Sequence, residues 1–232
     1  MNRAIVLSSG GIDSTTCLAM AVKEYGAENV LSVSVLYGQK HDKEKECAVK
    51  IAEFYGVEHR VIDITDLGIF TGSTCTLLAD NAEPVAQGTY AEQVSEGMSP
   101  IVSTYVPFRN GLMVSLIASL AMSVYPEDNV RIYLGVHRDD TLGHAYADCS
   151  YDFVRVMSDA IFMGTYGRVT VTAPLVRMSK AQVVAKGIEL EAPYELTWSC
   201  YEGGETPCGT CATCLDRAKA FEANGIDDPA LA

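Results

Sequence analysis

The stretch Arg3-Ala4-Ile5-Val6-Leu7-Ser8-Ser9-Gly10-Gly11-Ile12-Asp13-Ser14 decides the fold of this chain. Its first five residues are an aliphatic run of the kind that forms a buried β-strand. Residues 13–25 then carry apolar side chains at helical spacing, and Gly26 follows as a stop signal. The turn Ser9–Ser14 therefore joins the carboxyl end of a strand to the amino end of a helix. Open α/β sheets bind their ligands at such places.

The same alternation of strands and helices continues along most of the chain. Nearly continuous aliphatic runs predict further strands at residues 30–37, 58–62, 130–136 and 169–173. Periodic apolar patterns predict helices at residues 43–55, 109–124, 151–163, 180–186 and 211–223, with Gly187 ending the fourth. Such an alternation indicates a parallel sheet covered on both faces. We expect an α/β fold, doubly wound around a mostly parallel Rossmann-like sheet, with a small C-terminal segment that binds zinc.

Two places interrupt this alternation. Residues 66–107 are rich in Gly, Ser, Thr and Pro and predict a long loop, which in a compact domain is usually a functional lid or partly disordered. From Leu196 onward the pattern changes to a cysteine cluster and a final helix. We expect one domain over residues 1–195, with 66–107 as a lid or inserted loop, and a four-cysteine zinc segment with a helix over residues 196–232.

The composition limits the partners that this chain can have. It carries 17 basic and 30 acidic side chains, a net charge of −13. This charge opposes binding along nucleic acid, because each phosphate contact would be made against the protein's own field. The longest apolar region, Gly111–Val124, contains serines and is shorter than the ~18 residues of a membrane span. The first residues show no signal-peptide pattern, so we expect a cytoplasmic protein. The net charge and the short apolar region lead us to expect neither nucleic-acid nor membrane partners.

The turn Ser9–Ser14 has the features of a phosphate site. Its two glycines allow the backbone to approach an anion and expose N–H groups, and the helix behind adds the positive end of its dipole. Ser9, Ser14 and Thr15 add hydroxyl donors, and Asp13 suits a Mg²⁺ shared with phosphate oxygens. The turn is neither a Walker A loop nor G-x-G-x-x-G. The alternative is an ordinary glycine turn with a helix cap.

Four of the eight cysteines form a cluster, Cys200-x₇-Cys208-x₂-Cys211-x₂-Cys214. Short two-residue steps let backbone amides turn toward sulfur, and four thiolates complete a tetrahedral Zn²⁺ with no open position. We therefore expect one structural zinc per chain, with an iron–sulfur cluster as the alternative.

The turn matches the S-G-G-x-D-S loop of the ATP-pyrophosphatases of the PP-loop superfamily. Together with the cysteine cluster it resembles the 7-cyano-7-deazaguanine synthase family over nearly the whole chain. The other matching segments are Tyr37-Gly38-Gln39-Lys40-His41, Tyr105-Val106-Pro107-Phe108-Arg109-Asn110, Asp148-Cys149 and Thr197-Trp198-Ser199-Cys200-Tyr201. The resemblance implies a PP-loop domain over residues 1–195 and an ATP site formed by Ser8, Ser9, Gly10, Gly11, Ile12, Asp13, Ser14, Thr15 and Leu18.

The resemblance also implies a reaction. Mg²⁺-bound ATP would adenylate 7-carboxy-7-deazaguanine, ammonia would displace AMP to give an amide, and a second activation would yield the nitrile, a precursor of queuosine and archaeosine. Besides Asp13, the candidate catalytic or substrate-binding residues are Gln39, His41, Arg109 and Lys180. Arg109 would bind phosphate or carboxylate, and Lys180 would lie near the α-phosphate; each could instead be a solvated surface charge. His137 ends a strand and could line the site or cap the sheet. The resemblance suggests a homodimer.

The chain departs from the family pattern at three positions. Phe108 replaces a small residue, Ala147 replaces a proline, and Asp216 occupies a position that is usually apolar. Other functions stay open. The chain could be a ligase that transfers the same or a related acid to another amine, such as a protein amine. It could also be a tRNA thiolase or lysidine synthetase, an NAD or GMP synthetase, or a zinc-stabilised ATP sensor without turnover. The acidic charge weighs against the tRNA enzymes.

Overall fold

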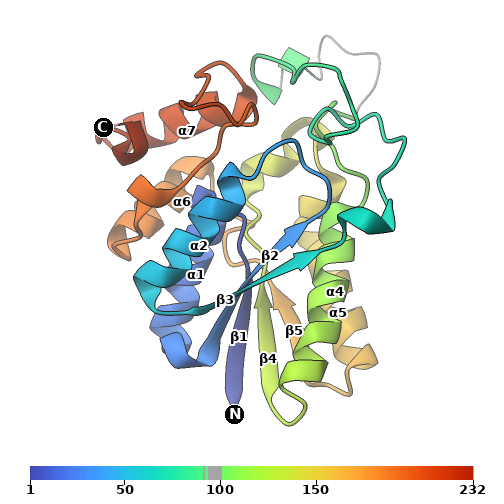
Figure 1. Ribbon diagram of the computed structural model, residues 1–232. Helices are drawn as coiled ribbons and strands as arrows, with labels where there is room; N and C mark the ends of the chain where they lie inside the picture. Colours follow the sequence, from blue (N-terminus) through green and yellow to red (C-terminus); the bar gives the residue numbers. More distant parts are fainter. Residues whose placement is uncertain (91, 94–100, 232) are drawn as a thin grey trace.

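The computed structural model describes residues 1–90, 92–93 and 101–231. Its centre is a five-stranded sheet in the order β3-β2-β1-β4-β5, in which all neighbouring strands are parallel (Figure 1). The strands are β1 (Asn2–Leu7), β2 (Val30–Leu36), β3 (Glu58–Asp63), β4 (Asn129–Tyr133) and β5 (Val169–Thr172). The chain reverses its direction of winding at β1, so that β1 and β4 border the switch point where such sheets bind ligands.

Helices cover both faces of the sheet, as the sequence predicts. One face carries α1 (Ile12–Tyr25), α2 (Lys43–Tyr55), α6 (Lys180–Glu189) and α7 (Ala212–Glu222), and the other carries α4 (Arg109–Val124) and α5 (Tyr151–Gly164) (Figure 1). Alternation along β1 explains the two cores: Ala4 and Val6 pack toward α1, whereas Ile5 and Leu7 pack toward α4. The expected doubly wound α/β fold is confirmed.

Two predicted element ends are wrong by more than one residue. The strand predicted at 130–136 ends at Tyr133, although the Leu134 amide still donates to the Thr172 carbonyl at 2.9 Å. The helix predicted to stop at Gly187 continues to Glu189. Gly187 is a packing position, because a Cβ there would lie 1.8 Å from the Tyr194 hydroxyl.

The region 66–107 is in large part folded against the cysteine segment. Cys75, Leu78 and Val106 form a small third core with buried cysteines of the C-terminal cluster. The Gly88 amide donates to the Thr210 carbonyl at 3.1 Å. Part of the predicted lid, residues 91 and 94–100, lies outside the described residues.

The predicted division at residue 195 falls within a shared core. Phe221 of α7 is fully buried among side chains of α1 and α6. No described helix is long and apolar enough to cross a membrane.

Candidate active site

A cavity of about 250 Å³ opens at the carboxyl edge of the sheet. Its walls come from the ends of β1, β2 and β4 and from the first turns of α1, α2, α4 and α6. Leu77 and Tyr90 of the predicted lid and residues of the cysteine segment complete them. Because parallel strands bring their carboxyl ends to one edge, residues far apart in the sequence meet here.

The turn Ser9–Ser14 has a fixed shape. Gly10 has φ +84°, and a Cβ at this position would lie 2.1 Å from the Glu44 carbonyl oxygen. A side chain is therefore excluded both by the backbone angle and by the close approach of α2. The Ser14 hydroxyl donates to the Gly11 carbonyl at 3.1 Å, and the Gly11 amide donates to Ser9 Oγ at 3.3 Å. These bonds hold the turn open toward the cavity.

The predicted ATP-binding residues divide into two groups. Six line the cavity: Ser8, Ser9, Gly11, Ile12, Asp13 and Ser14. Gly10, Thr15 and Leu18 do not line it. The Thr15 hydroxyl donates back to the Gly11 carbonyl at 2.8 Å, and Leu18 is buried in the core. These three residues support the turn from behind.

Asp13 lies at the centre of a charged group on one side of the cavity. Its Oδ2 accepts a hydrogen bond from Lys180 Nζ at 2.5 Å, and its Oδ1 is buried with no hydrogen-bond partner among the described residues. His137 Nε2 lies 3.9 Å from Asp13 Oδ1 and 3.4 Å from Asp140 Oδ1. Because the Asp139 amide donates to His137 Nδ1 at 3.2 Å, a neutral His137 carries its proton on Nε2, facing both carboxylates. His137 therefore lines the site, one of the two options left by the sequence.

The pKa values of the two carboxyl groups, Asp13 and Asp140, are shifted in opposite directions. Burial opposes ionisation of Asp13, but the Lys180 ammonium and His137 outweigh it and lower its pKa. Burial raises the pKa of Asp140, an effect that His137 only partly offsets and that the charge of Asp13 reinforces. Such opposed shifts in a cavity are typical of functional sites.

Arg109 lies in another part of the cavity, beside Tyr37. Its Nη1 donates to the Tyr37 hydroxyl at 3.1 Å, and its guanidinium carbon lies 5.7 Å from the centre of the Tyr37 ring. No carboxylate of a described residue forms an ion pair with it. Arg109 is therefore available to an anionic ligand rather than committed to a surface salt bridge.

Gln39 and His41 also line the cavity, and both support its wall. Gln39 Oε1 accepts from the Tyr37 amide at 2.9 Å, and Gln39 forms a β-bridge with Leu78 of the lid. The His41 ring packs so closely on Gly203 that a Cβ there would lie 2.3 Å from it. Burial lowers the pKa of His41. His41 Nδ1 is buried with no hydrogen-bond partner among the described residues, so a role of this ring in the site stays a prediction.

Several cavity residues were not predicted. Glu44 of α2 lines the cavity, and burial raises its pKa to about 7 against the opposing charge of Arg109. Tyr90 of the lid and Tyr146 also line it, together with Tyr201. The hydroxyls of Tyr90 and Tyr201 are 2.8 Å apart. The motif around Tyr201 was visible in the sequence, whereas Glu44 resembles any acidic residue in the first turn of a helix.

The three departures from the family pattern lie in different surroundings. Phe108 has φ +53°, is 54% exposed and packs edge-on against Phe153 with 5.8 Å between ring centres. Ala147 is exposed. Asp216 lines the cavity, and burial raises its pKa although Lys180 opposes the shift.

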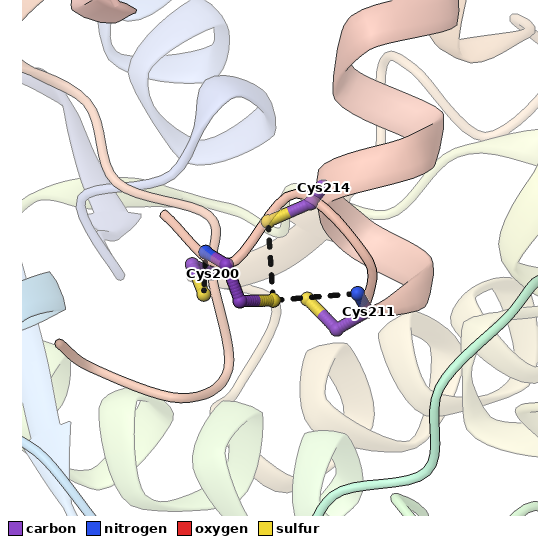
Figure 2. A group of neighbouring side chains, drawn as sticks. Cys200, Cys211 and Cys214 are labelled. Carbon is purple, nitrogen blue, oxygen red and sulfur yellow. Dashed lines mark hydrogen bonds between the residues drawn. The ribbon is translucent and has the colours of Figure 1, made fainter. Parts of the chain in front are cut away.

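The four clustered cysteines converge at the start of α7. Their sulfur atoms all lie within 4.8 Å of one another, and Figure 2 shows Cys200, Cys211 and Cys214 directed toward a common centre. Sulfur atoms bound to one tetrahedral zinc at about 2.3 Å would lie roughly 3.8 Å apart. The Cys208 amide donates to Cys200 Sγ at 3.3 Å, and the Cys211 amide donates to Cys208 Sγ at 3.4 Å. The donor set fits a metal such as zinc.

The remaining cysteines are not metal candidates. Cys149 lines the cavity and accepts a hydrogen bond from Asn110 Nδ2 at 3.3 Å. Burial raises the pKa of its thiol well above the ordinary value, so that it remains protonated at neutral pH. Cys149 is therefore a poor nucleophile here.

A parallel sheet with a serine- and glycine-rich turn after its central strand, and a charged cavity above that turn, defines the class: a PP-loop α/β protein. The family model described as queuosine biosynthesis protein QueC matches residues 3–225. The chain belongs to the QueC family. It is 38% identical to the 7-cyano-7-deazaguanine synthase of Archaeoglobus fulgidus over 99% of this chain and 90% of that protein. It is 40% identical to the synthase of Oceanobacillus iheyensis over 98% of this chain and 96% of that protein.

Proposed function

We propose that this chain is an ATP-dependent ligase that converts 7-carboxy-7-deazaguanine and ammonia into 7-cyano-7-deazaguanine, releasing AMP and pyrophosphate. One observation carries the proposal. In a chain of the QueC family, a single cavity contains the turn Ser9–Ser14 with Asp13 and Lys180, and also the unpaired cation Arg109. The relatives reported above are named 7-cyano-7-deazaguanine synthase, which matches the proposed product, and they align with nearly the whole chain.

The turn would bind the phosphates of ATP. Its exposed amides and the amino end of α1 offer donors and a positive dipole end to an anion. Lys180 would pass from Asp13 to the α-phosphate, where negative charge accumulates as the acid attacks. Positioning and charge stabilisation of this kind are the main contributions that a protein makes to such a transfer.

Mg²⁺ fits the residues around Asp13. The buried Asp13 Oδ1 has no hydrogen-bond partner among the described residues, and the Asp140 carboxylate lies beyond His137. Carboxylate oxygens with phosphate oxygens are the ligands that Mg²⁺ prefers. When bound with ATP, the ion would neutralise the pyrophosphate leaving group. Asp13 would hold it, and His137 would keep the carboxylates oriented.

Arg109 would bind the carboxylate of the deazaguanine acid before activation. Its guanidinium is held by Tyr37 and has no competing carboxylate partner. The cavity walls contributed by Tyr90, Tyr146 and Tyr201 are flat and aromatic, which suits a purine-like ring. Gln39 and His41 would support this wall from the other side.

Zinc would be bound by Cys200, Cys208, Cys211 and Cys214, one ion per chain, and would act structurally. Four thiolates leave no position for water or substrate. We place the protein in the cytoplasm, without nucleic-acid partners, in keeping with its charge of −13. The exposed apolar residues Val156, Phe162 and Met163 of α5 support a homodimer, which sedimentation would test.

The experiment is product identification. The protein is incubated with ATP, Mg²⁺, 7-carboxy-7-deazaguanine and ammonium, and the products are identified by mass spectrometry. We expect AMP, pyrophosphate, the amide and finally the nitrile. Release of ADP and phosphate would refute attack at the α-phosphate. Modification of a protein amine, with no amide or nitrile from ammonia, would keep the activation step and change the product.

A further inference from the structure

Glu44 is an acidic side chain without a partner in the wall of the cavity. It lies in the first turn of α2 and lines the same space as Arg109 and Tyr37. No ion pair among the described residues involves its carboxylate, and the charge of Arg109 only partly offsets the effect of burial on its pKa. A partly buried carboxylate that forms no ion pair is costly while it is charged, and a ligand that offers hydrogen-bond donors would lower that cost.

The nearby cation, Arg109, is not the partner of the Glu44 carboxylate. The Arg109 guanidinium donates to Tyr37 and stacks near its ring, and it forms no ion pair with Glu44. The same cavity thus contains a cation and an anion that form no ion pair with each other or with another described residue. A complementary ligand carries a negative group and, at a distance from it, a pair of hydrogen-bond donors.

The proposed purine acid has this pattern. Its carboxylate is the anion, and its guanine-like edge presents the ring N1–H next to the exocyclic amine, two adjacent donors. A carboxylate offers two acceptor oxygens and no donor, which matches that edge. Adenine presents one donor beside one acceptor, so the base of ATP fits Glu44 less well.

We propose that Glu44 is the specificity residue for the guanine-like edge of the acid, accepting from its N1–H and its exocyclic amine while Arg109 binds its carboxylate. The inference rests on the proposed function. Glu44 accordingly touches the substrate but takes no part in bond making. The side chain that distinguishes this acid from a purine acid lacking the amine comes from α2, and the phosphates are bound elsewhere in the cavity.

The test compares two acids in three proteins. The acids are 7-carboxy-7-deazaguanine and the same molecule without the exocyclic amine. The proteins are the wild type, Glu44→Gln and the control Glu46→Gln, whose side chain lies exposed on the same helix. Glutamine keeps the shape of Glu44 but directs one donor at the donors of the substrate. Pyrophosphate release gives kcat and KM for each acid and for ATP.

We expect the wild type and Glu46→Gln to prefer the amine-bearing acid by about 100-fold, the scale of an unpaired buried donor or two. In Glu44→Gln this preference should fall below about 10-fold, through KM, with the KM for ATP within about 3-fold of wild type. Equal losses for both acids would overturn the proposal. So would an increased KM for ATP with unchanged discrimination, which would indicate a ribose contact, or a decrease in kcat alone.

Calorimetry separates this inference from the proposed function. Binding of the two acids without turnover gives the same comparison. If the wild type binds the amine-bearing acid tightly and Glu44→Gln binds it weakly, recognition by Glu44 stands even where no nitrile forms. If the wild type binds neither acid, both the proposed function and this inference are wrong.

Discussion

Lys180 Nζ and Asp13 Oδ2 are 2.5 Å apart, although the two residues are separated by 167 positions in the sequence. Asp13 stands in the first turn of α1, and Lys180 is the first residue of α6. In the ligand-free protein each charge neutralises the other. A phosphate that binds the turn must therefore compete with Asp13 for Lys180, and a cation on Asp13 would release the lysine. We therefore expect metal and phosphate to bind together more tightly than either would bind alone.

Asp13→Asn removes one carboxylate charge and keeps the shape of the side chain. We expect AMP formation to fall by at least about 100-fold, because the proposed Mg²⁺ site loses its central ligand. The melting temperature should change by only a few degrees, since the asparagine keeps an acceptor oxygen for the hydrogen bond from Lys180 Nζ. Pyrophosphate release and thermal melting measure the two effects. Wild-type turnover in the variant would mean that Asp13 merely starts the helix.

Lys180→Gln should change how the free energy of unfolding depends on pH. The lysine lowers the pKa of Asp13, and a carboxylate with a lowered pKa stabilises the folded state above its unfolded pKa, near 3.9. That stabilisation is lost as the pH falls through the lower folded value. We expect the variant to be less stable by on the order of 1–3 kcal/mol at pH 7, a difference that shrinks below about pH 4. Urea unfolding across this range would measure it, and a constant difference would contradict it.

The pH dependence of stability expected from Glu44 is opposite to that expected from Asp13. Burial raises its pKa to about 7, so the folded protein binds this proton more tightly than the unfolded chain does. Stability associated with Glu44 is then present below its unfolded pKa, near 4.3, and is lost as the pH rises to about 7. Glu44→Gln should stabilise the ligand-free protein at pH 8 by on the order of 1–3 kcal/mol and have little effect at pH 4. Glu46→Gln serves as the exposed control, and equal pH profiles for both variants would refute the prediction.

Local signals in the sequence were sufficient for the elements that form the site. The helices predicted at 43–55 and 109–124 match α2 and α4, because Gly56 provides a left-handed stop and Pro107 precedes the start of α4. The turn Ser9–Ser14 was likewise predicted from its residue types and its place between a strand and a helix, and the four cysteines from their spacing. These features depend on residues close together in the chain.

The features that the sequence predicted wrongly or did not predict depend on contacts between residues far apart in the chain. The sequence predicts a helix stop at Gly187, but the role of this residue is set by Tyr194, whose hydroxyl occupies the space of a side chain. Glu44 could not be distinguished from an exposed helix charge, because its burial depends on the cavity wall assembled from separate segments. The folding of the lid onto the cysteine segment, through Gly88 and Thr210, leaves no local pattern.

Two variants of Phe108 would measure how much stability is lost at one departure from the family pattern. Its φ of +53° is a left-handed conformation that costs a non-glycine residue roughly 1–2 kcal/mol. Phe108→Ala and Phe108→Gly both remove the contact with Phe153, so that the difference between them isolates the backbone term. We expect the glycine variant to be more stable than the alanine variant by about 1 kcal/mol in urea unfolding. Greater stability of the alanine variant would show that the backbone relaxes at this position.

Removal of zinc should release the lid as well as the cysteine segment. The sulfur cluster fixes the residues that bind the lid: Gln87 forms a β-bridge with Cys211, and Gly88 donates to Thr210. The third core, with Cys75 and Val106, includes the cysteines themselves. Structural zinc contributes about 10–16 kcal/mol of apparent binding free energy, comparable to the stability of a whole domain.

Cys211→Ser should therefore lose zinc, melt at a lower temperature and become sensitive to protease within residues 70–106, while the sheet core resists cleavage for longer. Limited proteolysis with mass spectrometry, alongside zinc analysis, would locate the cuts. Cys17→Ser, at a buried cysteine outside the cluster, is the control and should keep both its zinc and its intact lid. A Cys211→Ser protein that holds no metal, yet keeps the melting temperature of the wild type and an uncut lid, would show that the cluster does not support this part of the fold. Cuts confined to residues 200–214 would show instead that the lid holds its place without the metal.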